Sequence, residues 1–219
     1  STASTDIPKK QSDAEIFSAY AGSQTCRECH APVFDLFTNS HHALAERPID
    51  PKLDQPFFDP PREIHHGTQT SFASFTNGHA QLRAASLEGG MKDFPLERVI
   101  GVAPLQQFLA PTHDGRFQVT ELAVDPKRGD WFDVYGLEDR TPGEWGHWLG
   151  RGMNWNNMCA ACHNTRVRKN YQDSSDSYST TMAESTVSCE ACHGPMKPHV
   201  TWQNEKHVNK PDPTLAHFN

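Results

Sequence analysis

All six cysteines of this chain belong to three copies of one short pattern, in which two cysteines are separated by two residues and followed directly by a histidine. This spacing is the attachment signature of haem c. Two thiols so spaced can each form a thioether to one vinyl group of a haem, and the adjacent histidine can bind the iron. The sequence therefore predicts three covalently attached haems c. The copies are Cys26-Arg27-Glu28-Cys29-His30, Cys159-Ala160-Ala161-Cys162-His163 and Cys189-Glu190-Ala191-Cys192-His193.

Other uses of paired cysteines fit this pattern less well. A structural zinc site needs no histidine directly after every second cysteine. A thioredoxin-like redox pair occurs once, before the helix of a βαβ unit. Disulfides across three two-residue gaps would close small, strained loops. Haem attachment is the interpretation that explains all six cysteines, with His30, His163 and His193 as proximal iron ligands.

A low-spin electron-transfer haem needs a second strong axial ligand, and of the 13 histidines the motifs use only three. Methionine is the alternative ligand and would raise the reduction potential, but none of the five methionines has a preferable setting. We predict His42, His147 and His199 as distal ligands, with His41 as the direct competitor of His42 and His66 as the next candidate.

Position limits which iron each candidate can reach. On a straight helix with a rise of 1.5 Å per residue, His41 or His42 would lie about 17 Å beyond His30 and would reach a neighbouring haem. His199 follows His193 by six residues and would have to fold around the haem edge to reach the opposite face of the same haem.

The elements that position these residues change in character along the chain. Residues 1–19 are polar and indicate an N-terminal arm that is mobile or packs on a partner. In the first haem segment, residues 20–50, apolar side chains at helical spacing predict a helix over residues 31–45 that stops at Pro48 and carries His41 and His42 near its end. These apolar residues are Val33, Phe34, Phe37 and Leu44.

Residues 51–135 contain no haem motif and indicate a β-rich insert. Alternation over residues 68–75, the turn sequence Thr76-Asn77-Gly78 and residues 80–84 form a strand-turn-strand pattern. Further short strands are expected at 98–102, 117–124 and 131–135. Residues 136–219 hold the second and third haem segment and the tail. The predicted fold is mixed: mainly short α-helices and irregular segments wrapped around three haems c, with a small β-rich insert, in one compact domain.

The composition of the chain limits the classes of partner that it can bind. The 219 residues carry 20 Lys and Arg against 27 Asp and Glu, a net charge of −7, without the basic cluster that nucleic-acid binding needs. No apolar run approaches the roughly 18–20 residues of a membrane span, so no membrane insertion is expected. An apolar fraction of 36% suggests a thin core, to which apolar porphyrin faces would add.

The haem-attachment motifs indicate the cellular compartment of the protein. In bacteria, haem is joined to such motifs outside the cytoplasm, so a periplasmic or extracellular location is expected. The first residues, Ser1-Thr2-Ala3-Ser4, include neither an initiating methionine nor an apolar signal region, which suits an exported form with its signal peptide removed.

Several stretches of this sequence occur in a specific order: residues 20–26, the His41-His42 stretch at 40–45, residues 101–109, His147-Trp148, residues 154–156 and residues 189–195. In that order they resemble the multihaem domain of bacterial tetratricopeptide-repeat cytochromes, which are similar to the tetrahaem cytochromes of nitrifiers. The resemblance extends over residues 20–203 and implies electron transfer. Matching positions in that family also favour His42, His147 and His199 as distal ligands.

The sequence thus predicts a trihaem c-type cytochrome that carries electrons between redox partner proteins along closely packed haems with two histidine ligands each. One alternative is a subunit of an extracellular haem filament, built from neighbouring copies of the chain. Another is an enzyme in which one haem keeps an open site for a small nitrogen or sulfur compound. The absence of a recognisable acid–base set favours electron transfer over catalysis, and we predict no catalytic residue.

Overall fold

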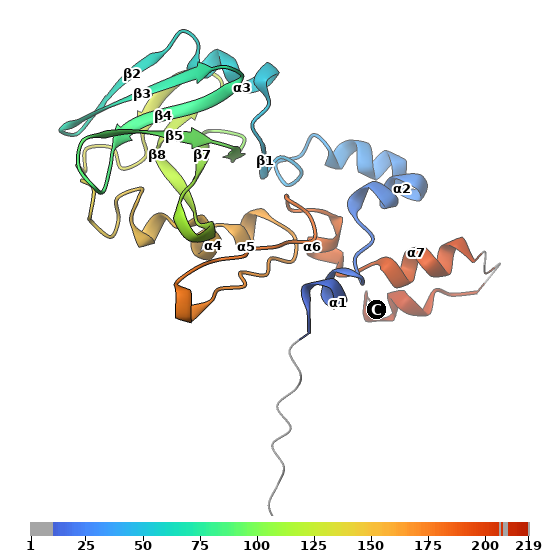
Figure 1. The fold of residues 1–219 in the computed structure, drawn as a ribbon. Coiled ribbons are helices and arrows are strands. Elements are labelled where there is room, and N and C mark those ends of the chain that lie inside the picture. The colour runs from blue at the N-terminus through green and yellow to red at the C-terminus, as the bar shows by residue number, and fades with distance from the viewer. Residues whose placement is uncertain (1–10, 206, 208–209, 219) are drawn as a thin grey trace, which may run out of the picture.

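The computed structural model of the chain describes residues 11–205, 207 and 210–218 (Figure 1). Its strands form a β body at one end of the molecule, and helices that carry two of the three motifs lie at the other end. The helices are α1 (Asp13–Phe17), α2 (Ser23–Phe37), α3 (Pro51–Phe58), α4 (Trp155–Met158), α5 (Ala160–His163), α6 (Cys189–His193) and α7 (Lys197–Asn204). Short 3₁₀ turns are η1 (His113–Gly115), η2 (Arg151–Met153), η3 (Asp173–Ser175) and η4 (Pro213–Phe218).

The β body contains two antiparallel sheets. One has the strand order β1-β6-β7-β8-β9 and the other the order β2-β3-β4-β5. The strands are β1 (Glu46–Pro48), β2 (Arg62–His66), β3 (Gln69–Thr76), β4 (His79–Ala85), β5 (Met91–Leu96), β6 (Arg98–Ile100), β7 (Gln106–Pro111), β8 (Phe117–Asp125) and β9 (Asp130–Asp133).

The β3–β4 hairpin has the expected strand-turn-strand pattern. Thr76 pairs with His79, and the two residues between them, Asn77 and Gly78, have φ angles of 52° and 83°. Positive φ at both positions is the geometry of the type I′ turn, one of the two favoured two-residue hairpin turns. This local prediction is confirmed, because the turn chemistry is fixed by neighbouring residues.

Apolar side chains from both sheets meet in one core. Phe58 of α3 lies at its centre and packs edge-on against Phe108 of β7 and Trp131 of β9, with ring centroids 5.0 and 5.2 Å apart. Leu82 and Leu122 bring one strand of each sheet into the same core. The β body is therefore held together without a contribution from any haem motif.

A second, smaller core joins the β body to the second haem motif. Leu109 and Val119 of β7 and β8 pack with Trp155 of α4 and Ala160 of α5, and Cys159 lies against this cluster. The motif is consequently anchored on a sheet of the β body.

The helix predicted over residues 31–45 differs from the observed one. Helix α2 begins at Ser23, contains the whole first motif and ends at Phe37, so His41 and His42 lie in turns beyond it. The chain then folds back, with Leu44 N–H donating to the Ser40 carbonyl at 3.2 Å. The apolar spacing does not continue through the run Asn39-Ser40-His41-His42, whose polar residues favour turns over a helix interior.

The described part of the predicted arm, residues 11–19, contains α1. This helix begins with a capping box between Ser12 and Glu15, and Ile16 is buried. Asp13 accepts hydrogen bonds from Arg168 and Asn170, far along the chain. Residues 1–10 lie outside the described residues.

Helix α3 and the strands β1, β2, β5 and β7 are not among the elements expected from the sequence, and the two sheets together form a large part of the described chain. The wrapping of helices around three haems, as part of the fold class, stays a prediction.

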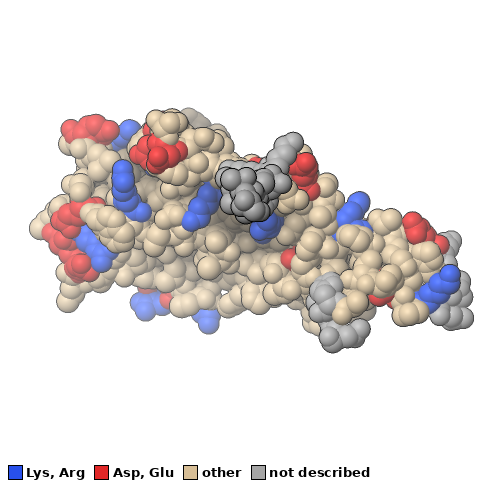
Figure 2. Space-filling view, turned by 90° about the horizontal axis from the view of Figure 1, so that it is seen from below, with Lys and Arg blue, Asp and Glu red and all other residues tan. Residues whose placement is uncertain are grey.

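The surface is of mixed charge on the face in Figure 2, where acidic and basic side chains are interspersed with uncharged areas. None of the helices in the described ranges has the length and apolar character of a membrane-spanning helix.

Candidate haem attachment sites

The first motif lies on a kinked helix. His30 has φ and ψ of −115° and 34° inside α2, two residues before Pro32. Proline has no amide hydrogen and its ring clashes with the carbonyl of the preceding turn, so the helix bends at this point. The proximal ligand therefore sits at the bend.

The same helix exposes apolar side chains beside the motif. Val33 and Leu36 are 66% and 78% exposed, and Cys29 is exposed as well. Val33 and Leu36 are three residues apart beyond the bend and hence lie on one face of the helix. An apolar porphyrin attached at Cys29 would cover this face, so the residues present fit the haem that the motif implies.

The third motif is docked onto the start of α2 by a buried carboxylate. Glu190, between the two cysteines of that motif, accepts the backbone N–H groups of Ala21 at 2.9 Å, Gly22 at 2.8 Å and Met196 at 2.7 Å. Gly22 has a φ of 81°, a conformation that favours glycine. Glu190 thus joins the third motif to the helix of the first.

This docking brings two attachment cysteines together. Cys189 lies close enough to Cys26 to contribute to the pKa of its thiol, although the two cysteines are 163 positions apart in the chain. Burial, with a smaller contribution from Cys189, raises the pKa of the Cys26 thiol to about 11, and burial raises that of Cys159 to about 11. Surroundings that disfavour a thiolate suit the neutral thioether that attachment forms.

The second motif has its proximal histidine fixed by the backbone. His163 Nδ1 lies 2.9 Å from the carbonyl oxygen of Ala45. A carbonyl can only accept, so Nδ1 carries the proton and the lone pair is on Nε2. His163 is consequently in the tautomer that an iron ligand at Nε2 requires.

A buried glutamate supports this arrangement from the β body. Glu46, directly after Ala45, accepts from Trp155 Nε1 at 2.8 Å and from Asn164 Nδ2 at 2.7 Å, and it pairs with Arg98 at 2.8 Å. These contacts connect β1 and β6 with both ends of the second motif. Burial raises the pKa of Glu46, and the Arg98 charge opposes that shift.

His199, a predicted distal ligand in the first turn of α7, lies beside His30. The ring centroids of His199 and His30 are 6.4 Å apart, and their planes differ by 26°. His199 Nδ1 lies 2.6 Å from Oδ2 of Asp212, whose pKa is lowered to about 2 because hydrogen bonds from Thr214 and His199 outweigh its burial. The ionised carboxylate accepts, so the lone pair of His199 is on Nε2.

His41 and His42 lie in the loop that contacts the other two motifs. Thr186, shortly before the third motif, donates through its hydroxyl to the carbonyls of His42 at 2.7 Å and Ala43 at 2.8 Å. Ala45, in the same loop, is the acceptor of His163. The expectation that His41 or His42 serves a neighbouring haem stays a prediction, and a loop rather than a long helix carries both residues.

His147 and His66 are buried together in the β body. His147 is completely buried, its Nε2 lies 3.7 Å from Glu121 Oε1, and its Nδ1 accepts the Leu149 N–H at 3.2 Å. His66 Nδ1 lies 3.6 Å from the same Glu121 oxygen. Because Nδ1 of His147 is an acceptor, the neutral ring carries its proton on Nε2, which leaves no lone pair there for an iron. Burial lowers the pKa of His147 to about 4.

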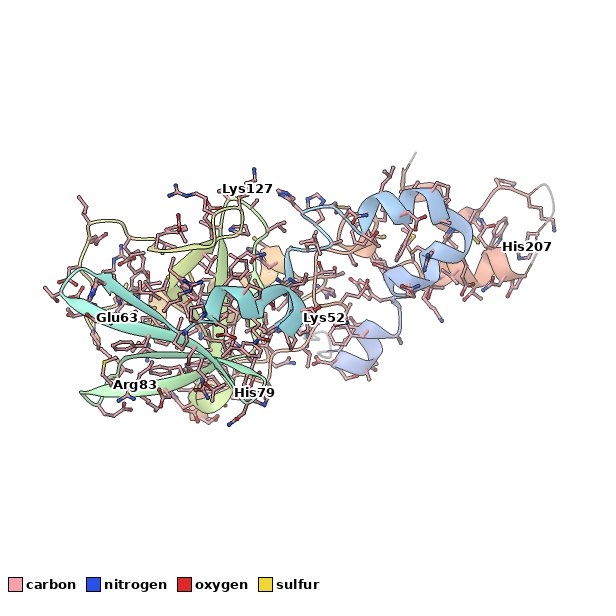
Figure 3. All side chains as sticks on the ribbon, turned by 90° about the horizontal axis from the view of Figure 1, so that it is seen from above. Lys52, Glu63, His79, Arg83, Lys127 and His207 are labelled. Carbon is pink, nitrogen blue, oxygen red and sulfur yellow. The ribbon has the colours of Figure 1, made fainter. Side chains whose placement is uncertain are left out.

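Two further histidines lie at opposite ends of the molecule. Figure 3 shows His79 at the rim of the β body and His207 at the opposite end of the molecule. All six cysteines are free, and among the described residues no group of three or more His, Cys, Asp or Glu side chains is arranged to hold a bare metal ion.

Two residues with clear structural roles at these sites gave no signal in the sequence. Glu190 occupies a position of the motif that any residue can fill, and Asp212 follows His199 by 13 residues. Only the folded chain shows that both carboxylates point at haem-binding elements.

Comparison with known proteins supports a c-type cytochrome. Residues 149–194, which include the second and third motifs, match the family model for cytochrome c554 and c-prime. The solved structure of the outer cell wall cytochrome OcwA has a TM-score of 0.50 and 19% sequence identity to this chain, and the match covers 86% of this chain and 34% of OcwA. The chain therefore spans about a third of the length of OcwA, and this likeness concerns the fold. No curated protein matches the chain.

Proposed function

We propose that the chain is a trihaem c-type cytochrome that carries electrons between redox partner proteins. Haem c, when bound, supplies a reversible one-electron iron couple. The chain would provide two cysteines and a proximal histidine for each of three haems, and its packing would hold the haems close together. Three complete motifs and the cytochrome family match to two of them support this proposal.

The observation that carries the proposal is the pairing of His30 with His199. Their centroid separation is 6.4 Å. Two imidazoles that share one iron have centroids roughly 6.3 Å apart, from iron–nitrogen bonds of about 2.0 Å and a ring radius of about 1.15 Å. His199 also has its Nδ1 proton bound by Asp212, as a ligating histidine should. Two strong ligands favour a low-spin iron suited to electron transfer.

The proximity of Cys26 and Cys189 supports close packing of the first and third haems, because thioethers at neighbouring cysteines would place two porphyrin edges side by side. The second and third motifs are 30 residues apart in the chain, whereas the first and third, 163 residues apart, meet only in the fold. Electron exchange between the first and third haems needs no movement of the chain.

The proposal assigns the His41–His42 loop to a haem other than the first and uses His42 as the ligand. It assigns no iron to His147 or His66, since both are buried in the β body around Glu121. An exported, periplasmic or extracellular location accords with covalent haem c and with the description of OcwA as an outer cell wall cytochrome.

Spectroscopy of the holoprotein tests this function. His199→Ala should convert one haem to a high-spin form that binds carbon monoxide, as seen by optical and electron paramagnetic resonance spectra. The matched control is His207→Ala, a change in the same tail at a residue whose ring lies 4.6 Å from that of Trp202, and it should leave the spectra unchanged. If His199→Ala leaves every haem as in the unmodified protein, the axial pair is refuted.

A functional readout completes the test. Small inorganic reductants and oxidised redox proteins should reduce and reoxidise all three haems of the unmodified protein reversibly. A haem that remains oxidised under every reductant, or that turns over nitrite instead, would contradict electron transfer as the function.

A further inference from the structure

Asp212 is a buried carboxylate whose contacts all converge on the His199 side of the molecule. Its Oδ2 accepts from His199 Nδ1 at 2.6 Å and from Gln203 Nε2 at 3.2 Å. Its Oδ1 accepts from Thr214 N–H at 2.8 Å and from Thr214 Oγ1 at 2.5 Å. The side chain is only 5% exposed. Four donors hold the carboxylate in a fixed position and favour its charged form.

The chain uses different partners behind the two histidines whose Nδ1 carries the proton, His163 and His199. Behind His163 the acceptor is the neutral carbonyl of Ala45, whereas behind His199 it is the charged carboxylate of Asp212. A carboxylate partner makes an imidazole more basic and a stronger donor to a metal than a carbonyl does. A stronger donor stabilises the more positive iron and lowers the reduction potential.

We propose that Asp212 is a positioning residue that aims His199 at the iron held by His30 and lowers the reduction potential of that haem. This inference rests on the proposed function, because it takes His199 as an axial ligand. Asp212 touches neither iron nor porphyrin in this proposal and acts only through the His199 ring. Asp212 and Thr214 would then form part of the surroundings of that haem.

The direct test is Asp212→Asn in the holoprotein, followed by spectroelectrochemical titration. The amide oxygen can still accept from His199 Nδ1, so all haems should stay low-spin. One of the three potentials should shift in the positive direction and the other two should not move. Asp35→Asn is the matched control, because Asp35 lies on α2 near the same haem but is 66% exposed and should give a smaller shift.

A second variant predicts a shift of opposite sign and does not disturb a buried group. Gln203 is exposed on α7 and shares Oδ2 of Asp212 with His199. Gln203→Ala removes the competing donor, so the carboxylate should interact more strongly with His199 and the same haem should shift to a more negative potential. Alanine also preserves the helix.

The outcomes separate the inference from the function it rests on. Unchanged potentials in both variants, with one haem still sensitive to His199→Ala, would overturn the role of Asp212 and leave the axial pair intact. An insensitive His199→Ala variant would instead refute the axial pair itself. If Asp212→Asn fails to fold, the negative shift in Gln203→Ala supports the inference, and the lack of that shift overturns it.

Discussion

Glu190→Gln tests how the first and third motifs are held together. The glutamate Oε1 accepts from Ala21 and Met196, and Oε2 accepts from Gly22. An amide oxygen can keep the first two bonds, but the amide nitrogen then faces the Gly22 N–H and the third bond is lost. One lost charge-assisted bond costs about 1.5–3 kcal/mol, and two bonds weakened to neutral strength bring the total to about 3–4 kcal/mol.

The assay is thermal and guanidinium unfolding of the holoprotein, monitored by circular dichroism. A loss of 1 kcal/mol lowers the Tm of a chain of this size by about 2–4 °C, so Glu190→Gln should lower it by about 10 °C. Glu28→Gln is the matched control, since Glu28 also lies between two motif cysteines but is exposed and should have no measurable effect. Equal stabilities of the two variants would refute the docking role of Glu190.

Three further predictions concern the β body. Asp54→Asn should lower the free energy of unfolding by about 3 kcal/mol in guanidinium titrations, because Arg47, which donates two 2.7 Å hydrogen bonds to Asp54, would lose its buried counter-charge. An unchanged free energy of unfolding would show that this ion pair does not stabilise the fold. Phe58→Ala should cost about 3–5 kcal/mol, whereas Phe72→Ala, at a residue 39% exposed, should cost under about 1 kcal/mol, and similar costs would disprove the placement of the core. Burial and Asp133 raise the pKa of Glu121 from 4.5 to about 8, so the stability that protonated Glu121 contributes is complete below pH 4.5 and is lost as the pH rises through 8. The unfolding midpoint of Glu121→Gln should therefore fall less between about pH 6 and 9 than that of the unmodified protein, and parallel curves would contradict the shifted pKa.

Features encoded within a few residues could be predicted from the sequence. The haem motifs depend on a fixed local spacing, and the β3–β4 hairpin depends on Asn77 and Gly78, which adopt positive φ at little cost. The expected strand over residues 117–124 also corresponds closely to β8, Phe117–Asp125.

Features that depend on distant residues could not be predicted. The helix over residues 31–45 was wrong because apolar spacing alone does not show where a helix ends, and α2 ends at Phe37. Strand β2 carries polar residues such as Glu63 and His65 on its exposed face, with few apolar residues to indicate a strand. The pairing of His199 with His30 joins residues 169 positions apart, and no local pattern relates them.

The number of covalent haems per chain is the most direct test of the central claim. Intact-mass spectrometry under denaturing conditions should give the 24.5 kDa polypeptide plus three haems, because thioether bonds survive unfolding while axial ligation does not. Cys162→Ser should weaken the attachment of one haem only. A mass that corresponds to fewer than three covalent haems in the unmodified protein would contradict the trihaem cytochrome.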